Sequence, residues 1–185
     1  VVVVLTLQAV ASLAVAVDRL ILLVRSQAAS RAFAHGAAPL LEKGDFAALL
    51  DQAARAKGSH LAALMYTGLK VYLDRVDAGD DAERAADLAR RAIERKGEST
   101  SDELNRGLNV LASTGSTAPF VGLLGTVLGI INAFQMIAAS GSGGIGTIGA
   151  AIGEALIVTG YGLCVAIPTV LDFNWISGRI SRFEM

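Results

Sequence analysis

Apolar residues along this chain gather in long charge-free runs, separated by a polar stretch and a short glycine-rich segment. Residues 1–17, 107–153 and 155–171 contain no charged side chain, and a Ser-Gly-rich segment at 140–146 divides the longest run. A helix needs about 20 apolar residues to cross a bilayer. The pattern therefore predicts three membrane-spanning helices, and because no strand-like alternation occurs we expect an all-α polytopic membrane protein.

These runs divide the chain into six expected segments. The first run is shorter than a full span, so we expect its outer end to be missing from this sequence. The segments are a first transmembrane helix at 1–24, a helical cytoplasmic domain at 25–110, a second transmembrane helix at 111–139, an outer loop at 140–146, a third transmembrane helix at 147–172 and a cytoplasmic C-terminal helix at 173–185.

A signal peptide is the alternative interpretation of the first run. Ala14-Val15-Ala16 has the small-x-small form of a cleavage site. The apolar pattern continues beyond that site to Arg25, which favours a spanning helix.

Turn signals predict helix ends inside the polar segment. Two glycines followed by N-cap residues and one capping box stand out: Gly44-Asp45, Gly58-Ser59, and Asp80 with Glu83. No proline occurs between 81 and 118, so the second span is predicted to extend as a helix into the cytoplasm, with Gly97 and Gly107 as its weak points.

The positions of lysine and arginine orient the expected spans. All 16 lie between residues 19 and 106 or at Arg179 and Arg182, and the segment 140–146 has none. Because positive residues near spans stay in the cytoplasm, we expect the polar domain and the C-terminus to be cytoplasmic and the N-terminus to lie outside.

Composition and motifs exclude several classes of protein. The chain is 53% apolar and 18% charged, and it has 16 basic and 17 acidic residues without a basic block, which argues against a nucleic-acid partner. The single cysteine, Cys164, excludes a disulfide scaffold and is predicted to pack inside the third span. His35 and His60 have no metal-binding spacing, and no nucleophile or phosphate motif occurs. We therefore expect that the protein is not an enzyme and that it binds neither a metal nor a cofactor.

Small residues recur in the second and third spans at the spacing that lets helices approach closely in lipid. They predict helix packing and, with two prolines, the shape of a pore: Gly122, Gly125, Gly129, Gly149, Gly153, Pro119 and Pro168.

Two hydroxyls allow a sharper argument. The two spans are antiparallel because a short loop joins them, so residues equally far from the loop centre share a depth. Thr126 and Thr159 share one level in this way, and Pro119 and Pro168 share another. The structural alternative is that each threonine bonds a carbonyl of its own helix.

Glu154 is the one charge between the last two apolar runs. A charge near the bilayer centre costs about 2.5–3.5 kcal/mol or more, so such residues usually face a cavity or a partner. We expect Glu154 to line a polar ion path; the alternative is that it reaches toward the outer headgroups.

Two sequence runs resemble one family. The run APFVGLLGTVLGI at 118–130 resembles the second helix of the MotA/TolQ/ExbB proton-channel family, and EALIVTGYGLCVAIP at 154–168 resembles its third helix. Asp18-Arg19 resembles the acidic–arginine pair at the inner end of the first helix. Three spans with a short outer loop resemble the ExbB/TolQ branch.

The resemblance implies a mechanism that the residues alone do not give. Members form a pentameric ring in the bacterial inner membrane around two single-span partners of the ExbD/TolR type, each carrying an aspartate. By resemblance, Thr126 and Thr159 line the pore at that aspartate and Glu154 belongs to the ion path. Proton flow then powers TonB-dependent transport, Tol-type envelope maintenance or gliding through a TonB/TolA-like or gliding-machinery protein.

Two alternatives stay open at this point. A passive membrane scaffold would also use packing glycines and a helical polar domain, although it does not require paired hydroxyls or Glu154. Threonine oxygens also coordinate sodium, so the choice between H⁺ and Na⁺ is open, and the resemblance favours H⁺.

Overall fold

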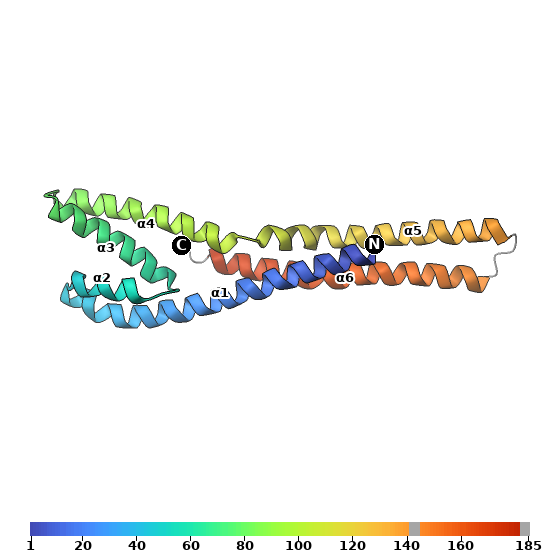
Figure 1. Ribbon diagram of the computed structural model, residues 1–185, viewed down its shortest axis with the longest axis horizontal. Coiled ribbons are helices and arrows are strands. Elements are labelled where there is room, and N and C mark those ends of the chain that lie inside the picture. Colours follow the sequence, from blue (N-terminus) through green and yellow to red (C-terminus); the bar gives the residue numbers. More distant parts are fainter. Residues whose placement is uncertain (141–144, 182–185) are drawn as a thin grey trace. The chain divides into compact units, whose positions relative to one another are not determined.

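The computed structural model describes residues 1–140 and 145–181 of the chain. Its helices are α1 (Val2–Lys43), α2 (Phe46–Arg55), α3 (His60–Asp77), α4 (Ala82–Asn105), α5 (Leu108–Ser140) and α6 (Ile145–Ser181) (Figure 1). No strand occurs within these residues. The all-α prediction is therefore confirmed.

Three of the helices are long and apolar enough to cross a membrane: Val2–Lys43, Leu108–Ala138 and Ile148–Ser181. This confirms the expectation of three spans. The first and last helices run on beyond the expected ends of their apolar runs, because helical hydrogen bonding does not stop where side chains become polar. Most of the expected outer loop, and the chain end from residue 182, lie outside the described residues.

The helix that was expected to extend from the second span is interrupted. α4 ends at Asn105, and Gly107 adopts a φ of 83° before α5 begins at Leu108. A positive φ is open to glycine and strained for other residues. Gly97, the other weak point, lies inside α4 without breaking it.

The chain forms two compact units. We call Val1–Asp18 with Arg106–Arg179 the span unit, and Arg19–Asn105 with the residues from Ile180 onward the polar unit.

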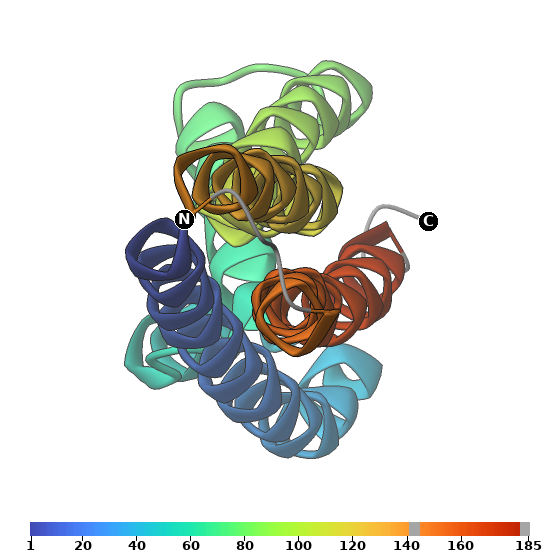
Figure 2. The same cartoon turned by 90° about the vertical axis from the view of Figure 1, so that its right-hand side faces the viewer.

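In the span unit, the first part of α1 lies along the antiparallel pair of α5 and α6 (Figures 1 and 2). A small apolar core forms where the three helices meet: Leu5, Ala118, Val165 and Ala166. Three of its four members are alanine or valine, so the helix backbones approach closely. Close packing of this kind is typical of membrane helices, because apolar side chains gain little free energy by moving from lipid into a helix interface.

Polar side chains join α1 to the other two helices. The Gln8 amide nitrogen donates to Thr117 Oγ1 at 3.0 Å. Thr169 donates to Ser12 Oγ at 3.3 Å, and the hydroxyls of Thr6 and Tyr161 lie 3.2 Å apart. Such interhelical bonds contribute about 0.6 kcal/mol each in membranes, and they fix the register of α1.

In the polar unit, two of the expected caps are confirmed and one prediction is wrong by a residue. The Asp45 and Ser59 side chains accept from the backbone amides of Ala48 and Ala62, each at 3.0 Å. At the third site Asp81, not Asp80, accepts from the amide of Arg84 at 2.7 Å. Asp80 instead lies near two arginine side chains, at 3.9 and 4.0 Å, and is not the cap.

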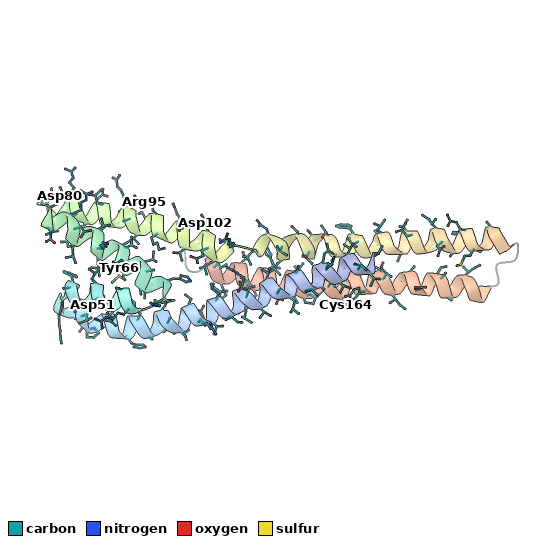
Figure 3. The ribbon with its side chains drawn as sticks, in the orientation of Figure 1. Asp51, Tyr66, Asp80, Arg95, Asp102 and Cys164 are labelled. Atoms are coloured by element: carbon teal, nitrogen blue, oxygen red, sulfur yellow. The ribbon has the colours of Figure 1, made fainter. Side chains whose placement is uncertain are left out.

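The core of the polar unit joins α1, α2 and α3 through Phe33, Ala37, Leu49, Ala53 and Ala62. Along the other side of α3, Gly68 lets Ile93 of α4 pack against the helix backbone. α4 carries exposed charges, among them Arg95 and Asp102 in Figure 3. Its ion pairs are exposed, so each stabilises the fold little.

A glycine substitution tests the packing of the span unit. A Cβ at Gly162 would lie 2.7 Å from the Ala118 carbonyl oxygen, whereas a Cβ at Gly160 would meet nothing within 4 Å. Gly162→Ala is expected to lower the free energy of unfolding by about 1–3 kcal/mol, because backbone has to shift. Gly160→Ala is the control and should leave it unchanged. Equal denaturation midpoints for both variants in detergent would contradict the packing.

A pH dependence follows from His60, the first residue of α3. Burial lowers the pKa of its imidazole from 6.5, and Lys96 lowers it further, against the opposing effect of Glu103. The unfolded chain therefore binds a proton at His60 more readily than the folded chain does. The free energy of unfolding is then unaffected by His60 above about pH 6.5, and it decreases as the pH falls below that value. His60→Phe should flatten this fall in a chemical-denaturation series, and His35→Gln should retain it.

Candidate ion-pathway site

The site begins where α5 and α6 come closest. A Cβ at Gly122 would lie 3.1 Å from the Thr159 Cα, and one at Gly162 would lie 3.1 Å from the Gly122 Cα. A Cβ at Gly162 would lie 2.7 Å from the Ala118 carbonyl oxygen and would force the backbone to move, whereas a Cβ at Gly122 would need a shift of a few tenths of an ångström. Gly125 and Gly129 continue the contact, against Val158 and Ala155.

The close approach places the hydroxyl of Thr159 against the opposite helix. Thr159 Oγ1 donates to the Gly122 carbonyl oxygen at 2.8 Å. The bond crosses between helices, so the alternative of a bond within the same helix does not hold for this threonine. Thr159 thereby fixes the register of α6 on α5.

Thr126 behaves differently. Its side chain is 8% exposed, and Oγ1 donates to the Leu123 carbonyl of its own helix at 2.7 Å. The alternative of a bond within the helix therefore describes Thr126. Each of the two threonine hydroxyls donates its one proton to a carbonyl oxygen. Because a hydroxyl oxygen also has two acceptor lone pairs, both oxygens remain available as acceptors.

The two threonines lie close in depth along the helix pair. Thr159 faces Gly122, which is four residues, or about 6 Å of helix, from Thr126. Val158, the residue before Thr159, faces Gly125, the residue before Thr126, so the two positions lie within about one helical turn of each other on adjacent helices.

Glu154 lies on α6, five residues before Thr159, and its side chain is exposed. Within the described residues it has no hydrogen-bond or ion-pair partner. Gly149 and Gly153, on the same stretch, would meet nothing within 4 Å if they carried a Cβ. This segment of α6 is therefore open on the single chain, with its carboxylate available to lipid headgroups, water or another protein.

The prolines lie inside the two spans, Pro119 in α5 and Pro168 in α6. Each removes one backbone donor from its helix. Cys164 is exposed on α6 (Figure 3), so it does not pack inside the chain as expected. Among the residues that the structure describes, no group of histidine, cysteine and acidic side chains could hold a metal ion.

Sequence reasoning did not single out three features of this region. They are Gly162, which completes the crossing with Gly122, the Gln8–Thr117 bond, and the Thr6–Tyr161 contact. The sequence signal for the two hydrogen-bonded contacts was the presence of Thr6 and Gln8 in an otherwise apolar run. These residues indicate specific contacts only once the helix that packs against them is known.

Comparisons with known proteins show the family of the chain. The sequence model of the MotA/TolQ/ExbB proton channel family matches residues 56–185, which include both helices of the crossing. The chain belongs to this family.

Curated relatives carry the names of two systems. The chain is 50% identical over 88 residues to the biopolymer transport protein ExbB of Xanthomonas campestris pv. campestris, covering 48% of this chain and 33% of the relative. It is 41% identical over 104 residues to the Tol-Pal system protein TolQ of Pseudomonas aeruginosa, covering 56% and 43%. It is 31% identical over 134 residues to ExbB of Salmonella typhimurium, covering 72% and 55%. The chain thus spans about half or less of the relatives' length.

Two valine substitutions separate the roles of the two threonines. Thr159→Val removes a bond between helices, and is expected to lower stability by about 0.6–1.7 kcal/mol. Thr126→Val removes only a bond within one helix and should change stability by less. Thermal unfolding of the two purified variants in detergent measures which one is less stable. A larger loss of stability in Thr126→Val would contradict the assignment of the interhelical bond to Thr159.

Proposed function

We propose that the chain is a subunit of a ring in the bacterial inner membrane that surrounds a single-span partner of the ExbD/TolR type. The ring couples proton flow to mechanical work in the cell envelope. The observation that carries the proposal is that Thr126 and Thr159 lie within about one helical turn of each other on α5 and α6, in a chain that belongs to a proton-channel family.

The exposed apolar surface supports an assembly. Inside the single chain, only 17%, 22% and 22% of the most apolar windows of the three spans are buried. The remaining surface would contact lipid, neighbouring copies and the partner helix. Five copies around a partner dimer is the arrangement that the family resemblance favours. In it Gly149 and Gly153, where an added Cβ would meet nothing within 4 Å among the described residues, would face a neighbouring copy.

The chemistry of the path follows from what the chain offers. The threonine oxygens provide acceptors, and Glu154 provides one titratable group. The carrier acid that completes the path comes from the partner. A proton moving through 100 mV yields about 2.3 kcal/mol, so several protons are needed for each mechanical step. The lysine and arginine positions favour a cytoplasmic polar unit and C-terminus and an outer N-terminus.

The process that is powered is one of the three that the family resemblance implies: TonB-dependent transport, Tol-type envelope maintenance or gliding. Relatives named as a biopolymer transport protein and as a Tol-Pal system protein support the first two. A passive scaffold remains the competing function, because both threonine protons are already engaged by backbone.

A double substitution separates the motor from the scaffold. Thr126→Val with Thr159→Val should abolish envelope output while the assembly keeps its mass. Thr126→Ser with Thr159→Ser keeps both hydroxyls and should retain output. Native mass spectrometry and a transport assay in cells supply the two measurements. Full output in the valine pair would favour the scaffold.

A second substitution tests the carboxylate. Glu154→Gln should lower proton flux into vesicles that hold the chain and its partner by roughly 100-fold, since proton relays through a positioned side chain contribute at least that much. An internal pH-sensitive dye measures the flux, and a sodium-selective dye run in parallel tests the ion. Unchanged flux would remove Glu154 from the path.

A further inference from the structure

The C-terminal end of the third span carries an exposed tryptophan beside an arginine. Trp175 and Arg179 lie four residues, or about one helical turn, apart on α6, and both belong to the span unit. The central carbon of the Arg179 guanidinium lies 4.9 Å from the centre of the Trp175 ring, which is a cation–π contact. Neither residue belongs to the ion pathway described above.

The depth of this pair in a membrane follows from the charge pattern of α6. Residues 155–171 carry no charge. As a helix they extend about 26 Å, close to the roughly 30 Å thickness of the hydrocarbon core. Trp175 lies about 6 Å beyond the end of that run, in the layer of the lipid headgroups. Tryptophan is enriched at this level in membrane proteins, because its ring is apolar and its N–H is polar.

The cation–π contact also places the charge of the arginine. Side chains of an α-helix point toward its N-terminus, and Arg179 reaches back one turn to Trp175. Its charge therefore lies at the level of the tryptophan ring, nearer the membrane than its own Cα. Stacking engages the flat face of a guanidinium, whereas its five N–H donors point outward in the plane, in a geometry that matches the oxygens of a phosphate.

An exposed apolar ridge leads from this pair along the span. Leu163, Ile167 and Leu171 precede Trp175 at intervals of four residues, and they are 44%, 58% and 64% exposed. Residues at this interval form one ridge on the surface of a helix. A phospholipid matches both parts of this surface, because its acyl chain can lie along the ridge while its phosphate lies at Arg179.

Carboxylates near this level limit where a phosphate can bind. Asp172 is exposed on α6, seven residues before Arg179 and so about 10 Å nearer the membrane centre. Asp18 ends the α1 segment of the span unit and already has an interaction within the chain. Asp172 therefore repels a phosphate that enters more deeply, and Arg179 attracts it at the level of the tryptophan ring.

We propose that Trp175 and Arg179 bind the headgroup of an anionic phospholipid. The phosphate accepts from the Arg179 guanidinium beside the indole ring, and an acyl chain lies along Leu171 and Ile167. A zwitterionic choline headgroup offers the same phosphate but also brings a cation toward the guanidinium, so it binds more weakly. The proposal requires that α6 crosses the membrane, and it does not depend on the proposed ring or on the ion path.

The fluorescence of one residue reports on this surface alone, because Trp175 is the one tryptophan of the chain. The full chain is reconstituted in vesicles of phosphatidylcholine. Phosphatidylglycerol or phosphatidylcholine with bromine atoms in the upper acyl chain is then included in increasing proportion. Bromine quenches a tryptophan that it contacts, so the two quenching curves give the relative affinity of the two headgroups at Trp175.

Arg106→Gln is the matched control for Arg179→Gln. Gly115 packs against Val170, and each arginine lies nine residues from this contact on antiparallel segments, so both belong to the same end of the span unit. The control removes an equal charge from that end and leaves the stacked pair intact. Circular dichroism checks that both variants keep their helical content.

We expect phosphatidylglycerol to bind at Trp175 with roughly fivefold higher affinity than phosphatidylcholine, since this is the contribution of one arginine near a membrane surface. Arg179→Gln should remove this preference, and Arg106→Gln should retain most of it. Equal quenching by the two lipids in the unmodified chain would overturn the proposal.

Two further results would also overturn it. Equal losses in Arg179→Gln and Arg106→Gln would mean that the total charge of this end, and not the stacked pair, sets the preference. Failure of both brominated lipids to quench the fluorescence would mean that a neighbouring copy of the chain covers Trp175.

Discussion

The contact between the backbones of α5 and α6 at Gly122 and Gly162 governs the geometry of the span unit. In lipid there is no hydrophobic force to drive apolar helices together, so close packing and buried hydrogen bonds hold them. Two glycines remove the side chains that would separate the helices, and the Thr159 hydroxyl then reaches the Gly122 carbonyl. Each feature requires the other, because the bond cannot form across a wider crossing.

This arrangement gives the threonines two tasks at once. Their protons are engaged by carbonyl oxygens, in one case across the helix pair and in the other within α5. Their lone pairs remain able to accept from water, from a protonated acid or from a cation. A serine keeps both abilities and a valine keeps neither.

The sequence was sufficient where a signal is local. Charge-free runs located the three spans, and the caps at Asp45 and Ser59 followed from glycine and short polar side chains at helix ends. Local signals failed where two neighbours compete: Asp80 and Asp81 are the same residue type, so the pattern could not tell which of them caps α4. Partners distant in sequence, such as Gln8 with Thr117, could not be paired without the packing of α1.

The break at Gly107 decides how force can travel between the two units. A continuous α-helix is a stiff rod, whereas a residue with positive φ interrupts the ladder of hydrogen bonds that makes it stiff. α4 and α5 are separated in this way, but α1 and α6 each pass from one unit into the other without interruption. Torque applied to the spans would therefore be transmitted to the polar unit along the two continuous helices, α1 and α6, rather than across the interruption at Gly107.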